Sequence, residues 1–286
     1  MATPAQRIRD LVAADTVLMP GVYDAITARI AARLEFDVVF ISGYSVSAAR
    51  LGEPDFGFLT ESEMADAARS VTRVSTVPVI VDADTGYGNA VNVMRTVRDF
   101  QDAGAAGVFL EDQVWPKKCG HFQGKQVIPT EEHAAKIRAA VDARGGRDLF
   151  IVARTDARQP LGTGEAIARC LAYKEAGADA LFVEAPQSVE ELEQIARELP
   201  PPLVANMIER GVTPHLTRTE LKELGYQLIV CPLAALYAAT KAATRVLTEL
   251  KEQETTAALY DELVTFDEFG DLVELDQRYA DESRYA

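Results

Sequence analysis

The sequence predicts an α/β fold, a single (β/α)8 barrel of the TIM type. Eight short apolar runs alternate with eight helical patterns over roughly 250 of the 286 residues. The runs carry few internal charges, which is typical of parallel strands buried on both faces. Polar residues gather where the runs end, and in such a barrel these ends meet at one face, where the active site lies. These polar residues are Asp24, Ser42, Asp82, Asp84, Glu111, Asp112, Arg154, Asp156, Glu184 and Asn206.

The strands are predicted from runs of β-branched and aromatic residues that stop at Gly, Pro, Ser or an acid. An open doubly wound sheet is the alternative fold, but no Gly-x-Gly-x-x-Gly turn follows the first run. The predicted strands are 16–21, 37–43, the run that begins at Val77, 106–112, 148–156, 180–186, 202–206 and 226–231.

The helices are predicted from apolar spacing and capping residues. Asp24 lies at one helix start, and Thr60 with Glu63 forms a capping box at another. Residues 44–59 are predicted as a loop, because glycines and a proline interrupt them. The predicted helices are 25–34, 60–72, 92–103, 130–144, 165–176, 188–199, 219–224 and 234–252.

Composition limits the classes of partner. The net charge of −15 argues against nucleic acid or an anionic membrane. The first ten residues lack the apolar core of a signal peptide, and no apolar run is long enough to span a bilayer. Three scattered cysteines are too few for a disulfide framework or a zinc site. We therefore expect a cytoplasmic protein.

Two segments are distinguished along the chain. Residues 1–254 are expected to form the catalytic barrel. Residues 255–286 form a C-terminal helical extension, and from Thr256 onward it carries nine acidic residues and two arginines between scattered Leu, Phe and Tyr. These apolar residues suggest that the extension packs on a partner subunit, whereas a solvated surface helix and tail is the simpler alternative.

Asp82 and Asp84 end the third strand in the stretch Asp-Ala-Asp-Thr-Gly-Tyr-Gly. Because side chains alternate along a strand, the two carboxylates are expected to point the same way. Adjacent acids raise each other's pKa unless a cation lies between them. A hard divalent ion such as Mg²⁺ prefers oxygen ligands of this kind. A turn with two solvated or capping acids explains an isolated Asp-x-Asp equally well.

Cys119 lies in the polar loop after the fourth strand, within the segment Pro-Lys-Lys-Cys-Gly-His. Nearby cations lower the pKa of a thiol and make it available for proton or nucleophilic chemistry. A lone cysteine is more often inert packing, but this one is expected at the catalytic face. Cys170 and Cys231, which lie among apolar residues, are expected to be core.

These residues resemble the isocitrate lyase and phosphoenolpyruvate mutase superfamily. The resemblance rests on residues 117–121 after Glu-Asp-Gln (111–113) and on residues 82–88, and it extends over nearly the whole chain. The cysteine is typical of the lyase branch, because the phosphonate-handling branch lacks it. Within that branch the loop is most similar to the 2,3-dimethylmalate and 2-methylmalate lyases and the petal death protein.

The resemblance implies a cofactor, a binding set and an assembly. Mg²⁺, for which Mn²⁺ is a possible substitute, would be held most directly by Asp82, with Asp84, Glu111 and Asp55 holding its waters. A homotetramer is implied, a dimer of dimers whose last helices swap between paired subunits. The implied substrate-binding residues are Ser42, Gly43, Tyr44, Asp82, Gly120, His121, Arg154, Glu184 and Asn206.

Two departures from the family's sequence pattern narrow the choice of substrate. Methylisocitrate lyases carry an arginine for a third carboxylate where this chain has Tyr237, which favours a substrate with two carboxylates. Oxaloacetate-hydrolysing members carry a serine where this chain has Pro232, which disfavours hydrolysis.

The expected reaction is retro-aldol-like cleavage of a 2-hydroxydicarboxylate to a 2-oxoacid such as pyruvate and a carboxylate enolate. Tyr44, or Glu111 acting through water, is the candidate base, and Arg154 with the two loop lysines would neutralise the enolate. Cys119 would protonate it as general acid, on a loop that closes to exclude water. The alternatives are oxaloacetate hydrolysis or decarboxylation, methylisocitrate cleavage, phosphonate chemistry, and non-catalytic binding of an oxoacid.

Overall fold

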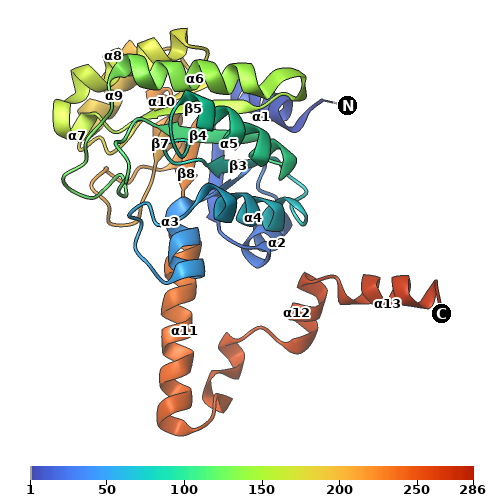
Figure 1. Cartoon of the computed structure of the whole chain (residues 1–286). Helices are drawn as coiled ribbons and strands as arrows, with labels where there is room; N and C mark the ends of the chain where they lie inside the picture. The colour runs from blue at the N-terminus through green and yellow to red at the C-terminus, as the bar shows by residue number, and fades with distance from the viewer. Residues whose placement is uncertain (1) are drawn as a thin grey trace. The chain divides into compact units, whose positions relative to one another are not determined.

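The computed structural model describes residues 2–286, and its eight parallel strands close into a barrel (Figure 1). Each strand pairs with the next along the chain, and β1 pairs with β8 to complete the ring. The predicted (β/α)8 class is therefore confirmed. The strands are β1 (Val17–Val22), β2 (Val39–Ile41), β3 (Val79–Asp82), β4 (Gly107–Glu111), β5 (Phe150–Thr155), β6 (Ala180–Val183), β7 (Leu203–Asn206) and β8 (Leu228–Cys231).

Every predicted helix is present, and its local signals act as expected. Asp24 caps α2, and Thr60 and Glu63 form the capping box of α4. The α-helices are α1 (Pro4–Ala14), α2 (Ala25–Arg33), α3 (Gly43–Val46), α4 (Glu61–Thr72), α5 (Ala90–Asp102), α6 (Thr130–Arg144), α7 (Arg158–Leu161), α8 (Thr163–Glu175), α9 (Val189–Glu198), α10 (Arg218–Leu224), α11 (Ala234–Gln253), α12 (Phe266–Leu272) and α13 (Leu275–Ser283).

The predicted loop 44–59 is wrong in its first part. Helix α3 begins directly after β2, and a π-helical turn (η1, Ser47–Leu51) continues it. The Ser42 hydroxyl accepts a hydrogen bond from the Ser45 amide and starts this helix. The breakers at Gly52, Pro54 and Gly57 act only after the π turn, where Gly52 ends it with a left-handed backbone.

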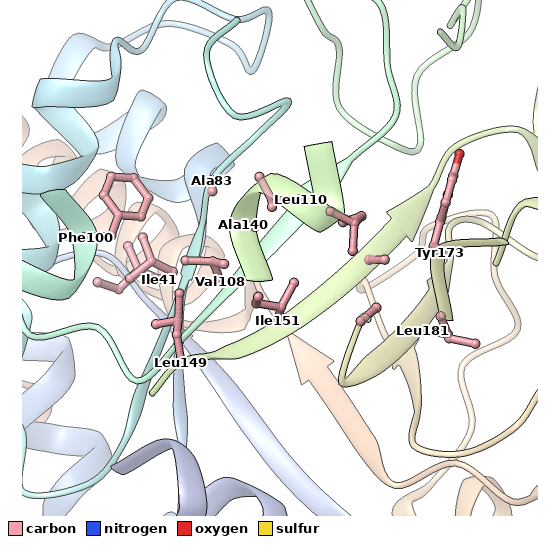
Figure 2. Packing of buried hydrophobic residues seen from close by; sticks show 14 of the residues in the cluster. Ile41, Ala83, Phe100, Val108, Leu110, Ala140, Leu149, Ile151, Tyr173 and Leu181 are labelled. Carbon is pink, nitrogen blue, oxygen red and sulfur yellow. The ribbon is translucent and has the colours of Figure 1, made fainter. Parts of the chain in front are cut away.

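Two apolar clusters surround the strands on both faces, as expected for a parallel barrel. In β2 the middle residue Phe40 belongs to the interior cluster, whereas its neighbours Val39 and Ile41 pack outward against the helices. Figure 2 shows part of the outer cluster, including Ile41, between strands and helices. The interior cluster also contains Ile8 of α1 together with Leu228, the first residue of β8, and α1 contacts β5, so α1 covers the N-terminal end of the barrel.

The chain divides into two compact units, residues 1–234 and 235–286. The second unit begins within α11 and also contains a 3-10 turn (η3, Ala257–Glu262), α12 and α13. Among its residues, Leu259 is the only large side chain that is buried, whereas Phe266 is 86% exposed. Across residues 2–286, no helix combines the length and apolar character needed to cross a membrane.

Candidate active site

A cavity of about 40 Å³ lies at the C-terminal ends of the barrel strands. It brings together most of the residues that the sequence predicted for the site. Asp84, Glu111 and Gly43 lie behind its wall, in contact with lining residues. The predicted residues that line the cavity are Ser42, Tyr44, Asp55, Asp82, Cys119, Gly120, His121, Arg154, Glu184 and Asn206.

Asp82 is the last residue of β3, and its carboxylate is oriented by two backbone amides. Gly43 N–H donates to Oδ2 at 3.2 Å, and Asp84 N–H donates to Oδ1 at 3.1 Å. A Cβ at Gly43 would lie 2.9 Å from Asp82 Oδ2, so a larger residue here would push the Asp82 carboxylate out of this position. Asp84 follows the strand with φ 46°, so strand alternation does not orient it as expected. The left-handed turn nevertheless brings both carboxylates beside Gly43.

Lys117 joins the loop after β4 to these acids. Its buried ammonium lies 2.7 Å from Asp55 Oδ1 and 2.7 Å from Asp84 Oδ1. The backbone N–H of Cys119 also donates to the Asp55 carbonyl at 3.0 Å. Tyr87 donates its hydroxyl to Asp84 Oδ2 at 3.2 Å, and its ring meets Trp115 of the loop edge-on at 6.0 Å. The loop is therefore held over the cavity on the side of β3.

The acids behind the cavity are poorly solvated. Burial raises the pKa of Asp84 to about 7, although Lys117 opposes the shift. Burial also raises the pKa of Glu111 well above its ordinary value, opposed by Arg154 and Lys117. Among the described residues, no group donates a hydrogen bond to Glu111 Oε1. A further cation beside these two carboxyl groups would lower their pKa and stabilise their ionised forms.

Arg154 lies among three carboxylates on the opposite side of the cavity. Its Nε is 2.9 Å from Asp156 Oδ2 and 3.3 Å from Glu111 Oε2, and its Nη1 is 3.4 Å from Glu184 Oε2. The guanidinium carbon lies 5.4 Å from the centre of the Phe182 ring. The acids keep the pKa of Arg154 well above its usual value, so it remains charged despite burial.

Glu184 connects Arg154 to His121 and Asn206. Burial alone would raise the pKa of Glu184, but Arg154 and His121 lower it to about 2. Val212 N–H donates to His121 Nδ1 at 3.1 Å, which leaves the other ring nitrogen, Nε2, 3.0 Å from Glu184 Oε1. Asn206 Nδ2 donates to the same carboxylate at 3.2 Å. Glu184 is thus an ionised anchor for three polar groups at the cavity.

Cys119 lines the cavity and is 8% exposed. The expected lowering of its thiol pKa is wrong. Burial raises the pKa to about 12, the charges of Asp55 and Glu184 add to this shift, and Lys117 opposes it only weakly because it is paired with acids. The thiol therefore stays protonated at neutral pH, a state suited to proton donation and not to nucleophilic attack.

Lys118 does not lie at the cavity, so the expected second cation is wrong. The residue is half-buried, and its Nζ lies 3.5 Å from the Gly124 carbonyl. The Gln113 side chain instead holds its backbone, accepting from Lys118 N–H at 3.0 Å and donating to Lys118 C=O at 2.8 Å. Adjacent positions in a loop point in different directions, which the spacing Lys-Lys does not reveal.

The sequence reasoning missed Lys125 and the apolar walls of the cavity. Lys125 is a buried cation that lies 2.8 Å from Asp156 Oδ1. In a polar loop without regular periodicity, no pattern distinguishes it from a solvated lysine. The apolar lining residues are Phe40, Phe109, Phe182, Ile208, Val230, Pro232 and Leu233. Their strand positions were predicted, but alternation alone does not tell which of them reach the cavity.

The donor atoms around the cavity fit Mg²⁺. Around the cavity, the carboxyl groups outnumber the cations. Among residues 2–286, no three His, Cys, Asp or Glu side chains converge closely enough to hold a metal by themselves. The acid oxygens, the unsatisfied Glu111 Oε1 and the excess of negative charge fit a hard ion that keeps part of its water. The carboxyl groups are Asp55, Asp82, Asp84, Glu111, Asp156 and Glu184, against the cations Lys117, Lys125 and Arg154.

A family model described as phosphoenolpyruvate phosphomutase matches residues 8–251. The chain belongs to this family. The superfamily expected from the cysteine loop and the acid pair is therefore confirmed, and the chain is an enzyme of the phosphoenolpyruvate mutase and isocitrate lyase superfamily.

Curated members of the phosphoenolpyruvate phosphomutase family match nearly the whole chain. A chloroplastic carboxyvinyl-carboxyphosphonate phosphorylmutase of Arabidopsis thaliana is 56% identical over 274 residues, 94% of this chain and 81% of the relative. A 2,3-dimethylmalate lyase of Eubacterium barkeri is 49% identical, covering 99% and 98%. The petal death protein of Dianthus caryophyllus is 51% identical, covering 94% and 85%. These relatives are named for two kinds of reaction, phosphoryl transfer and lyase cleavage, so membership of the family does not determine the substrate.

Solved structures of the superfamily superpose on the chain. A crystal structure of 2,3-dimethylmalate lyase has a TM-score of 0.94 at 36% identity and covers 100% of this chain and 96% of its own. A phosphonopyruvate hydrolase in complex with oxalate and Mg²⁺ has a TM-score of 0.89 at 29% identity, covering 99% of each chain. A relative with the same fold thus holds Mg²⁺ together with a small dicarboxylate.

Proposed function

We propose that this enzyme is a carbon–carbon lyase that cleaves a 2-alkylmalate, such as 2,3-dimethylmalate or 2-methylmalate, to a 2-oxoacid such as pyruvate and a carboxylate. The observation that carries the proposal is the protonated Cys119 thiol, which lines one cavity with Asp82 and Arg154. An acid beside bound cations is what carbon protonation of an enolate requires.

The acids on one side of the cavity and Arg154 on the other would bind different groups. Mg²⁺ would be held by Asp82 directly and by Asp84, Glu111 and Asp55 through water. When bound, it supplies Lewis acidity at the substrate's hydroxyl and carboxylate oxygens. Arg154 stays charged on the other side of the cavity and would bind a substrate carboxylate together with Asn206, Ser42 and the Gly120 backbone.

The reaction needs a base for the hydroxyl proton and an acid for the enolate carbon, and side chains at the cavity offer both. Tyr44 lines the cavity and Glu111 lies behind Arg154, and each is a candidate base for the hydroxyl proton. Cys119 donates its proton to the enolate carbon. A thiol with a pKa near 12 is still a far stronger acid than the carbon acid that results, so burial does not prevent the transfer.

Two residues argue for an alkylmalate among the alternatives. Pro232 lines the cavity and offers no hydroxyl where oxaloacetate-hydrolysing members carry a serine. Tyr237 stands where methylisocitrate lyases carry an arginine. Phosphonate chemistry is the second candidate, favoured by the 56% identity to a phosphorylmutase. The cysteine argues against it, because the phosphonate-handling branch lacks this residue.

A substrate panel tests the assignment. With Mg²⁺ present, we expect 2-oxoacid release from 2-methylmalate or 2,3-dimethylmalate, measured with a coupled lactate dehydrogenase assay. Isocitrate and methylisocitrate should have kcat/KM values lower by roughly tenfold to hundredfold, because a third carboxylate would be left without a charged partner. Efficient cleavage of either tricarboxylate, hydrolysis of oxaloacetate to oxalate, or turnover of phosphonopyruvate alone would contradict the proposal.

We also propose that residues 235–286 pack on a second copy, in a homotetramer with swapped C-terminal helices. Within this unit, large apolar side chains are exposed, among them Val264 at 70% and Phe266 at 86%. Apolar surface of this extent normally marks a protein interface.

Light scattering tests this assembly. We expect a mass of four times the 31.1 kDa of the chain. Phe266→Glu should shift the protein toward smaller species, because it places a charge in an apolar contact, whereas Asp267→Asn at the neighbouring position should not. A monomeric wild type would contradict the proposal.

A further inference from the structure

Lys125 is a buried cation to which the proposed mechanism assigns no role. It follows the cysteine segment in the same loop, and the exposed fraction of its side chain is 0%. Its Nζ contacts two groups, the carbonyl oxygen of Gly120 within the loop and Asp156 Oδ1 of the barrel at 2.8 Å. A buried ammonium is costly unless it is fully paired, so these contacts determine where the side chain lies.

Asp156 is a rigid partner for this ammonium. It follows β5, and its backbone N–H donates to Asp112 Oδ1 at 2.9 Å. Asp112 is in turn held by Thr155 at 2.7 Å, Tyr173 at 2.8 Å and Arg169 at 3.1 Å. The backbone that carries the Asp156 carboxylate is thus fixed, and Arg154 and Lys125 keep the pKa of this carboxyl group below its ordinary value.

One carboxylate therefore connects the loop with the cavity. Asp156 accepts hydrogen bonds from Lys125 and from both Nε and Nη2 of Arg154. On the loop side, a Cβ at Gly120 would overlap Arg154 and the Glu184 side chain, so the loop backbone lies directly against these groups. Gly120 is adjacent to Cys119, and its carbonyl is the atom that Lys125 holds.

We propose that Lys125 is a positioning residue that ties the Gly120 carbonyl to Asp156 and so holds the adjacent Cys119 thiol at the cavity, in register with Arg154. The contact with Asp55 and the Lys117 ion pairs hold the β3 side of the loop, and Lys125 holds the β5 side. The proton-delivery role of the held thiol rests on the proposed function, whereas the tie itself does not.

The test is the alkylation rate of Cys119 in the full chain without substrate. Iodoacetamide is added to wild type, Lys125→Met and Lys118→Met, and modification of the Cys119 peptide is followed by mass spectrometry. Loss of a charged hydrogen bond should free the loop, so Lys125→Met should be alkylated faster by roughly tenfold or more. Lys118→Met removes the same charge from the same loop at a half-buried position outside the cavity, and its rate should stay within about twofold of wild type.

Kinetics separate positioning from general damage. In Lys125→Met, kcat for the alkylmalate should fall by roughly tenfold with a smaller change in KM, because Arg154, Asn206 and Ser42 belong to the barrel and not to the loop. If circular dichroism shows that Lys125→Met does not fold, Lys125→Gln is measured instead. Its side-chain amide is a neutral hydrogen-bond donor for the Gly120 carbonyl.

Alkylation at the wild-type rate in the Lys125 variant would overturn the proposal, as would equal acceleration in both lysine variants. Faster alkylation of the Lys125 variant alone supports the tie even if no alkylmalate is cleaved. In that case only the proposed function fails.

Discussion

Removal of divalent cations with EDTA is expected to abolish turnover, and added Mg²⁺ to restore it. Around the cavity, six carboxyl groups face three cations, and the single charge of Lys117 is shared between Asp55 and Asp84 on the loop side. A dianionic substrate would enter a site with excess negative charge unless a divalent ion offset it. Activity is measured after chelation and again after titration with Mg²⁺ or Mn²⁺, and Mn²⁺ is expected to substitute.

A binding measurement separates the metal from the chemistry. Mg²⁺ should raise the melting temperature of the wild type, because an ion that binds only the folded state stabilises that state. Asp82→Asn should lose both this increase and the activity. Asp102→Asn, an exposed carboxylate at the end of α5, should keep both. Full activity after chelation would remove the ion from the mechanism.

Cys119→Ser is expected to lower kcat by ~10²-fold or more and leave the fold intact. The serine hydroxyl is a weaker acid than the thiol and is attached by a shorter bond, so it delivers a proton to carbon less readily. Because burial keeps the pKa of the Cys119 thiol near 12, the wild-type acid form should persist throughout the neutral range. The measurement is kcat for release of the 2-oxoacid, with circular dichroism as the check on folding.

Cys231→Ser is the matched control, because Cys231 is a partly buried thiol at the end of β8 that does not line the cavity. Its kcat should remain near that of wild type. If Cys119→Ser also turned over at a near-normal rate, the thiol would not be the general acid.

The barrel was predictable because most strand residues are buried on both faces, so each strand is a short, mainly apolar run in the sequence. The eight strands fall inside or within one residue of their predicted ranges. The errors lie where local signals are weak or compete. Helix α1 was not predicted, since only Ala5, Ile8 and Val12 of this helix are buried, which leaves a weak apolar pattern. Helix α3 was hidden because the breakers that follow it suggested a loop.

The candidate site was predictable as a set of residues but not as a network. Strand ends place the Asp82 carboxylate and Arg154 at one face, and the barrel makes them converge. The ion pairs of Lys117 and Lys125 depend on the path of an irregular loop, which no periodicity records. The pKa of Cys119 was misjudged for the same reason, since Lys117 points to acids and Lys118 to a backbone carbonyl rather than to the thiol.

Trp115 is the sole tryptophan of the chain, and it lies in the loop that carries Cys119, with its indole edge-on to Tyr87. Because Tyr87 also donates its hydroxyl to Asp84, it connects the indole of Trp115 to the carboxyl groups beside the cavity. This indole is therefore the one tryptophan signal of this enzyme, although nine tyrosines also emit, and it lies in the loop that carries Cys119. Stopped-flow fluorescence with selective tryptophan excitation can test in unlabelled protein whether this loop moves during turnover.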